Sequence, residues 1–438
     1  MKILFILPEY YPHSGGGIST YYLNYLKALK PIVNQINVLV GSGYVQSDES
    51  YVVNGIDIQY LKPHIYQKYL SKFSKFDLYP EYRNNIAASW AMFEQAKNGE
   101  GFDVVECVDF GLGFIPWLVN HSKPVVVRLH GSSGQIDLAE NCSDGLGADL
   151  HRQAELILLK SADVIISHSK ANKNYWENIL QQKDIEVIYP IYEQQLTTIP
   201  LSEKKNNGIV CARIQEWKGP DVLAEALSLI DNTKIKIDWF GRDTPFNNSI
   251  SKNNQLKLKY PKIWGNIIVS HLPLRNTEIA LMQQKAKFAI IPSTWDMFNF
   301  TGLEYMNAET LLICSSGAGI SELIINGING FIFEKGNAKA LADCIMNLSK
   351  ISDNDYSIIT KNAKSTLSDI LNKKMILEAN ISQYKKLSRL TLTKNRNVFI
   401  EDLFRPNEKN KTYIDPIEHI SLKKLLAHIL QRIIKKFS

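Results

Sequence analysis

Short runs of apolar, largely β-branched residues recur along the first third of the chain and alternate with segments of helical period. The runs are KILFIL, INVLV, DVVECV, PVVVRLH and DVIISH, at residues 2–7, 36–40, 103–108, 124–130 and 163–168. Helical period is clearest between them at residues 19–29 and 149–159. Continuous apolar runs of this length are typical of parallel strands that are buried on both faces. The pattern predicts a doubly wound, Rossmann-like α/β domain at residues 1–188.

The alternation stops after Pro190 and then restarts. The text YEQQLTTIPLSEKKNNG is polar and has no period, which predicts a linker at residues 189–207. The new runs are GIVCAR, KIKIDWF, NIIVSHL, FAIIP, LLICS and GFIF, at residues 208–213, 234–240, 266–272, 288–292, 311–315 and 330–333. They predict a second Rossmann-like domain at residues 208–375. Two such domains form a cleft at the carboxyl ends of their strands, where ligands of these folds bind.

Length and composition agree with two folded domains. The chain has 438 residues, of which 45% are hydrophobic and 21% charged, whereas single cores stop growing at about 250–300 residues. Its five cysteines are scattered and include no Cys-x-x-Cys pair, so neither a disulfide framework nor a zinc site is indicated. The N-terminal apolar run meets Pro8 too early for a signal peptide. We therefore expect a cytoplasmic protein.

The C-terminal segment, residues 376–438, is predicted to hold a return helix and a basic amphipathic tail. Residues 385–438 contain 13 Lys or Arg against 5 Asp or Glu, although the whole chain has a net charge of only +6. Within SLKKLLAHILQRIIKKFS, residues 421–438, apolar side chains share one helical face. This pattern is typical of a helix on an anionic membrane surface. Docking of the helix on the protein body or on a partner is an equally open interpretation.

The segment PSTWDMFNFTGLEYMNAE begins where a predicted strand ends. A helix is expected to open near Thr301, which would make the backbone N–H groups of residues 301–303 an anion site. Asp296 and Glu304 lie eight residues apart around this helix start. Carboxylates there suit hydrogen bonds from ribose or sugar hydroxyls. The alternative is that Asp296 caps a turn and Glu304 is a first-turn acid.

The segment CARIQEWKGPDVLAEAL places two cations beside a strand-to-helix turn. Arg213 ends the predicted strand, Lys218 precedes Gly219, and Pro220 suits the first helical position. Two cations beside a helix N-terminus form a natural diphosphate site. Each of them alone is also consistent with a solvated surface cation.

Three further positions lie at predicted strand ends. Gly15, Gly16 and Gly17 follow the first strand and permit close approach to a ligand, although the loop does not fit a G-x-G-x-x-G fingerprint. His130 ends VVVRLH and should face the cleft. Glu106 and Asp109 end the neighbouring strand, where they could bind acceptor hydroxyls or cap the next helix.

Another tight glycine loop, SGAGISE, precedes Glu322. This carboxylate could contact the donor sugar or lie in the first turn of a short helix.

Together and in this order, these motifs resemble glycosyltransferase family 4, over roughly residues 1–380. Arg213, Lys218 and Gly219 match the family's R-x4-K-G turn, and Asp296 with Glu304 matches its E-x7-E element. The resemblance implies a GT-B fold, with two Rossmann-like domains facing a central cleft. It also implies that the two cations bind the donor diphosphate, that Glu304 binds the ribose and that Asp296 lies against the transferred sugar.

The resemblance extends to the other candidate residues. Gly16 and Gly17 look like the family's phosphate-side loop, His130 like its cleft histidine, and Glu322 like the acid of its G-G-x-x-E loop. Phe298, Asn299 and Thr301, inside the acidic element, are expected donor contacts. Two departures are Asp296, where the family usually has glutamate, and VIYPIYE, where many members have V-I-P-N-G-V.

The implied activity is retaining transfer of a sugar from a nucleotide diphosphate sugar, which is a substrate and not a cofactor. No metal is expected, since the cations and helix N-termini would stabilise the leaving diphosphate. The implied acceptor is a glycan or a lipid-linked molecule in cell-surface polysaccharide or glycolipid synthesis, and no nucleic-acid partner is expected. The tail would place the protein peripherally on the inner face of the plasma membrane.

Three other functions fit parts of the pattern. A dinucleotide-dependent oxidoreductase would use two Rossmann-like halves, but the missing G-x-G-x-x-G argues against it. A nucleotide-sugar epimerase would bind the same donor without a glycosyl acceptor. A non-catalytic binding protein of the same fold is conceivable because of Asp296.

Overall fold

The structure is a computed structural model of the chain. It describes residues 1–12, 16–140, 146–181, 184–193, 198–230, 235–245, 250–390, 392, 403–407 and 421–437. Gly15 of the glycine loop, and most of the tail between residues 391 and 420, lie outside these ranges.

The N-terminal domain is built on an eight-stranded sheet of order β3-β4-β2-β1-β5-β6-β7-β8. Its strands are β1 (Lys2–Leu7), β2 (Gln35–Val40), β3 (Ser50–Val53), β4 (Ile56–Tyr60), β5 (Val104–Val108), β6 (Val125–Leu129), β7 (Val164–Ser167) and β8 (Ile185–Val187). All neighbours are parallel except β3 and β4. The central strands β5 and β6 are fully buried, which explains why their sequences are almost entirely apolar.

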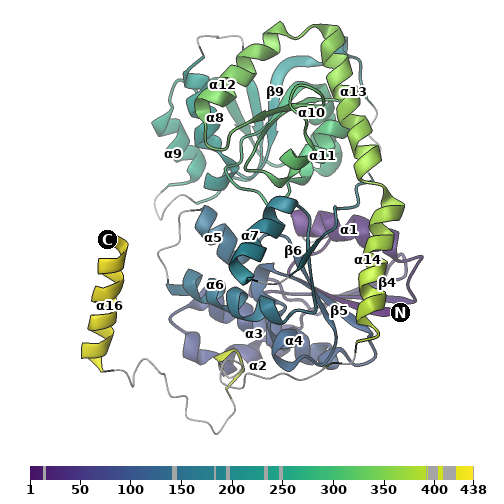
Figure 1. Cartoon of the computed structure of the whole chain (residues 1–438), viewed down its shortest axis with the longest axis vertical. Coiled ribbons are helices and arrows are strands. Elements are labelled where there is room, and N and C mark those ends of the chain that lie inside the picture. Colours follow the sequence, from purple (N-terminus) through teal and green to yellow (C-terminus); the bar gives the residue numbers. More distant parts are fainter. Residues whose placement is uncertain are drawn as a thin grey trace.

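In the described part of this domain, α-helices connect these strands (Figure 1). They are α1 (Gly17–Leu29), α2 (Pro63–Lys72), α3 (Pro80–Gln95), α4 (Ile115–Asn120), α5 (Ser133–Ala139), α6 (Leu146–Leu158) and α7 (Lys170–Leu180). The doubly wound α/β prediction for this half is confirmed.

The second domain has an all-parallel six-stranded sheet of order β11-β10-β9-β12-β13-β14. Its strands are β9 (Lys205–Cys211), β10 (Ile237–Phe240), β11 (Ile268–His271), β12 (Ala286–Ile291), β13 (Leu311–Ser315) and β14 (Phe331–Phe333). Its α-helices are α8 (Pro220–Ser228), α9 (Lys252–Lys259), α10 (Asn276–Lys285), α11 (Phe300–Asn307), α12 (Ala338–Asn347) and α13 (Asp353–Ile370). The two-domain prediction is therefore confirmed as well.

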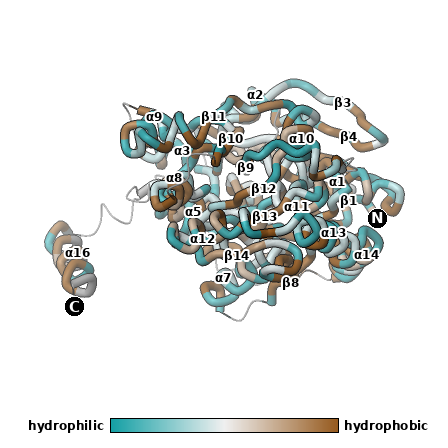
Figure 2. The backbone as a smooth tube through the Cα atoms, turned by 90° about the horizontal axis from the view of Figure 1, so that it is seen from above, coloured by the Kyte–Doolittle hydropathy of each residue, from teal (hydrophilic) through white to brown (hydrophobic). Residues whose placement is uncertain are grey.

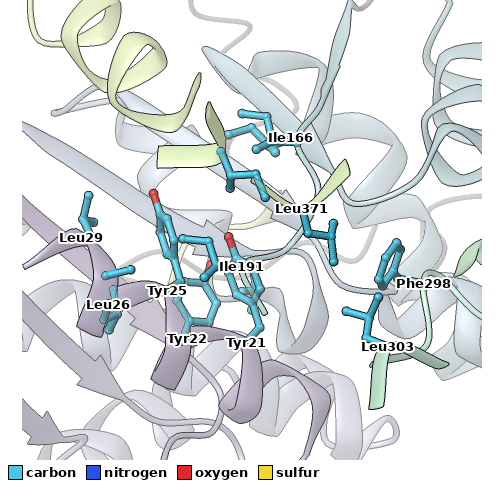
Figure 3. Close-up of a cluster of buried hydrophobic side chains, with 14 of the residues drawn as sticks. Tyr21, Tyr22, Tyr25, Leu26, Leu29, Ile166, Ile191, Phe298, Leu303 and Leu371 are labelled. Atoms are coloured by element: carbon cyan, nitrogen blue, oxygen red, sulfur yellow. The ribbon is translucent and has the colours of Figure 1, made fainter. Parts of the chain in front are cut away.

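Helix α14 (Lys373–Leu387) follows α13 and lies against the N-terminal domain (Figure 1). The largest apolar core crosses between the domains: it joins Tyr21, Tyr22 and Tyr25 of α1 to Phe298 and Leu303 of the second domain. Figure 3 shows these side chains in one cluster. The chain therefore crosses twice between the domains, once after β8 and once before α14.

The last helix, α16 (Leu422–Phe437), stands apart from both domains (Figures 1 and 2). In the part of the chain that the structure describes, none of the helices combines the length and apolarity needed to cross a membrane.

Candidate active site

The turn after β9 carries Arg213 and Lys218, as the sequence predicts. Gly219 ends this turn in the left-handed region, with φ of 72°. A Cβ atom there would lie 1.9 Å from the carbonyl oxygen of Pro292, so only glycine allows the contact. The N–H of Thr294 also donates to the Trp217 carbonyl over 2.9 Å. The cationic turn is thereby fixed against the loop that follows β12.

Lys218 and Asp296 form an ion pair at the centre of this arrangement. Nζ lies 2.6 Å from Oδ2, and the two side chains are only 13% and 10% exposed. The same ammonium lies 3.7 Å from the centre of the Trp217 ring, which adds a cation–π contact. Burial lowers the pKa of Lys218, and the pairing with Asp296 opposes this shift. Two residues that lie 78 positions apart in the chain therefore meet at one point.

Arg213 lies in a crowded electrostatic environment. Burial lowers the pKa of its guanidinium, the charge of Arg242 lowers it further, and the acids Glu9, Glu140 and Asp296 raise it. Glu9 and Glu140 come from the N-terminal domain, so a cation of one domain faces two carboxylates of the other. Nothing in the sequence singled out Arg242, although it follows the end of β10 as Arg213 follows the end of β9.

Helix α11 begins one residue earlier than predicted, and Asn299 is its N-cap. The backbone of Asn299 has a φ of 83°, and its side chain accepts a hydrogen bond from the N–H of Gly302. Its amide also donates to Asp296 Oδ2 over 2.8 Å, and Thr301 Oγ1 donates to Asn299 Oδ1 over 2.5 Å. The predicted anion site at residues 301–303 is thus partly occupied by the chain's own side chain.

Glu304 lies one turn into α11. Gln283 of α10 donates from Nε2 to Glu304 Oε2 over 2.6 Å. Burial raises the pKa of Glu304, and the bond from Gln283 opposes the shift. Tyr305, the next residue, accepts from the backbone N–H of Cys211 over 2.8 Å. This bond holds α11 against the end of β9, two residues before Arg213.

His130 ends β6 beside a second histidine that the sequence did not single out. The rings of His130 and His168 are 4.8 Å apart, and each contacts Tyr21. Burial lowers the pKa of His130 well below its usual range, helped by the nearby charges of His168 and Arg128. For His168, burial lowers the pKa to about 3. Both rings are therefore neutral at physiological pH.

The Nε2 atoms of both histidines are buried, and among the described residues neither has a hydrogen-bond partner. His168 Nδ1 lies 3.0 Å from the Ile188 carbonyl, which fixes its proton on Nδ1 and leaves Nε2 as an acceptor. Such an atom suits a hydroxyl of a sugar.

Gly16 and Gly17 begin α1, with Gly16 as the N-cap. A Cβ atom on Gly16 would lie 2.1 Å from Glu9 Oε1, and one on Gly17 would lie 3.9 Å from Phe300 of the second domain. Glu9 also accepts from the N–H of Ser19 over 3.3 Å. A carboxylate thus lies at the helix N-terminus where the resemblance placed a phosphate contact.

The chain is similar in sequence to known proteins, both in the second domain and over most of its length. Residues 193–366 match the family described as glycosyl transferases group 1. An uncharacterized glycosyltransferase of Methanocaldococcus jannaschii is 26% identical over 360 residues, which cover 80% of this chain and 88% of that protein. These matches support a glycosyltransferase.

Two solved structures share this two-domain arrangement. The sucrose-phosphate synthase of Thermosynechococcus elongatus has a TM-score of 0.67 at 15% identity, and the match covers 88% of this chain and 99% of that one. Anabaena HepE in complex with UDP-glucose has a TM-score of 0.60 at 16% identity, covering 88% and 100%. The fold is GT-B, as predicted.

The geometry does not support the predicted acceptor contact of Glu106. Its side chain is 0% exposed and forms a bidentate pair with Arg128, at 2.7 and 3.0 Å. Tyr22 and Tyr384 also donate to its two oxygens, at 2.7 and 2.5 Å. Glu106 points into the core because it lies inside β5 and not at the strand's end. It joins the N-terminal domain to α14.

Asp109 is likewise buried. Its carboxylate accepts from the N–H groups of His130 and Gly131, at 2.7 and 3.2 Å. Burial raises its pKa to about 7. It therefore holds the turn that carries His130, and its side chain does not cap the helix that follows it, as the alternative prediction had it.

Glu322 and Phe298 lie at the contact between the domains. Glu322 Oε2 accepts from the N–H of Lys170 over 2.9 Å, at the start of α7. Phe298 is 0% exposed, and its ring packs near those of Tyr189 and Phe300. Phe298 therefore offers a donor no exposed surface. Glu322 keeps one buried oxygen, Oε1, that has no hydrogen-bond partner among the described residues, so its donor contact stays a prediction.

One prediction concerns Glu155, which supports the loop after His130. It accepts from Ser132 Oγ and the Gly134 N–H, and burial raises its pKa to about 8 from a usual 4.5. Between pH about 4.5 and about 8, the folded protein keeps a proton on this group that the unfolded chain releases. The free energy of unfolding therefore falls as the pH rises through that range. We expect Glu155→Gln to gain Tm relative to wild type across that window, measured by calorimetry.

The matched control is Glu225→Gln, at an exposed position of α8. A Tm difference for Glu155→Gln that does not change with pH would show that Glu155 is ionised in the folded protein.

Proposed function

We propose that this protein is a retaining family 4 glycosyltransferase. It would move a sugar from a nucleotide diphosphate to a glycan or lipid-linked acceptor in cell-surface polysaccharide or glycolipid synthesis. The observation that carries the proposal is the meeting of Arg213 and Lys218 with the loop from Asp296 to Glu304 at one sheet edge. The UDP-glucose complex of HepE makes a UDP-hexose the first donor to test.

In the proposed complex, Arg213 and Lys218 bind the diphosphate, Glu304 accepts from a ribose hydroxyl, and His130 contacts the sugar. Lys218 would exchange Asp296 for phosphate oxygens, while Asn299 keeps its bond to Asp296. The bond from C1 to the diphosphate breaks, and the bond from C1 to the acceptor oxygen forms on the same face. The acceptor proton passes to the departing phosphate oxygen.

In the proposed complex, two cations at the leaving group, the exposed Arg213 and the partly buried Lys218, supply the stabilisation that a metal ion gives in other transferases. Metal independence is therefore part of the proposal. The Lys218 ammonium then exchanges one anionic partner, Asp296, for another, the diphosphate.

The proposal predicts nucleotide release that an acceptor stimulates and that EDTA leaves unchanged. The test is a panel of UDP-, GDP- and ADP-sugars with and without acceptor sugars, and NMR of the product should show the donor's anomeric configuration. Epimerised donor without release would indicate an epimerase, and donor binding without turnover would indicate a binding protein. Loss of activity in EDTA that added metal restores would contradict metal independence.

We further propose a cytoplasmic location, peripheral on the inner face of the plasma membrane. The support is the basic, amphipathic C-terminal segment. A lipid-linked acceptor would lie at such a surface.

A further inference from the structure

The apolar face of α16 is exposed. Its side chains Leu422, Leu426, Ile429, Leu430, Ile433 and Ile434 are 47–78% accessible. The spacing of residues 422, 426, 429 and 433 places these four on one side of the helix. Figures 1 and 2 both show the helix away from the two domains. The protein body therefore does not cover this face in the structure, which leaves a membrane surface or a partner as its cover.

The charge of this segment indicates what covers the face. Residues 421–438 contain five Lys or Arg and no Asp or Glu. Lys423 and Arg432 lie beside the apolar face, where long side chains can reach phosphate groups at a membrane surface. Two copies of such a helix would repel each other, whereas an anionic lipid surface attracts each basic residue.

A short segment upstream anchors this helix to the N-terminal domain. Phe404 is 1% exposed and lies in the core beneath α3, and Trp90 Nε1 donates to its carbonyl over 2.8 Å. Arg405 donates to Asn120 Oδ1 over 2.9 Å, and the Asn407 N–H donates to the Lys72 carbonyl over 3.0 Å. Thirteen residues separate Asn407 from Ser421, a length that spans at most about 45 Å. The helix is thus tethered to the domain in which the acceptor is expected.

We propose that α16 docks the protein on an anionic lipid surface. Its apolar face enters the boundary between headgroups and acyl chains, and its cations contact lipid phosphates. The inference deepens the proposed function, because it names the surface that would present a lipid-linked acceptor. The tether would keep the N-terminal domain beside that surface.

The test is flotation of the full-length protein with vesicles of phosphatidylcholine, alone or mixed with phosphatidylglycerol. We expect binding to the mixed vesicles only, and weaker binding at high salt. The double variant Leu426→Asp/Ile433→Asp should bind at least about 100-fold less, because it removes two apolar side chains from the buried face and places two negative charges at an anionic surface. The matched control is Leu258→Asp, at an α9 leucine that is 76% exposed, and it should bind like wild type.

Equal flotation of the double variant and wild type, or no binding to anionic vesicles, would overturn the proposal. So would a dimer, seen by light scattering, that the double variant converts to a monomer, because the partner would then be a second copy. Turnover of a soluble acceptor should be equal in the double variant and wild type. Absence of turnover in both, with vesicle binding intact, would refute the proposed function alone.

Discussion

Lys218→Ala is expected to lower kcat about 1,000-fold, the size of effect seen when one preorganised charge-stabilising group is removed from a leaving or developing anion. Lys218 is buried beside Trp217 and Asp296. Without its ammonium, the departing diphosphate would lose one of the two cations that bind it in the proposed complex. The measurement is steady-state nucleotide release with donor and acceptor both varied.

The pattern of the kinetic change separates this role from a structural one. A group that acts on the leaving diphosphate should lower kcat more than it raises the donor KM. The control is Lys339→Ala, an exposed lysine on α12, which should behave like wild type. Thermal unfolding should show that both variants are folded. A wild-type kcat in Lys218→Ala would show that Arg213, Lys218 and Asp296 do not form the donor site.

Much of the fold could be predicted because buried parallel strands consist of continuous runs of apolar residues. β1 and β13 coincide with the runs at residues 2–7 and 311–315. The missed strands of the first domain lack this signal: β3 is mostly exposed, β4 alternates buried and partly exposed residues, and β8 has three residues. β9 was predicted to begin at residue 208, but it begins at Lys205. The prediction missed its first residues because they are polar and mostly exposed. Pairing with neighbouring strands, and not the burial of side chains, extends it into the predicted linker.

The cations of the candidate site could be predicted because a strand-to-helix turn is a local feature. Arg213, Lys218 and Gly219 lie within seven residues, and their placement follows from the end of β9 and the start of α8. The pair between Lys218 and Asp296 could not be predicted in the same way, because it depends on how two separate loops pack. The same holds for His168, whose position beside His130 results from the order of strands β6 and β7.

Glu106 illustrates a different limit. From its place in VECVDFG, Glu106 was predicted either to bind the acceptor or to cap the next helix, and neither prediction placed it in the core. A buried carboxylate requires partners, and these come from α1, from β6 and from α14, nearly 280 residues away. Only the assembled fold brings them together.

The last prediction tests this network through Arg128. Arg128→Met should reduce the free energy of unfolding by about 3–5 kcal/mol, because it leaves the Glu106 carboxylate buried without its counter-charge. Arg128 also donates to Asn380 Oδ1 over 2.7 Å, so the variant would loosen α14 from the N-terminal domain. Urea unfolding followed by tryptophan fluorescence measures the loss.

The double variant Glu106→Gln/Arg128→Met should regain most of that stability, because replacing both partners removes the uncompensated charge. A double variant as unstable as Arg128→Met would show that packing, and not charge, sets the cost. The same pair decides the role of Glu106 in the reaction. If Glu106 bound the acceptor, Glu106→Gln would raise the acceptor KM without changing stability. The closed network instead requires Glu106→Gln to lower stability and to leave the acceptor KM of the folded protein unchanged.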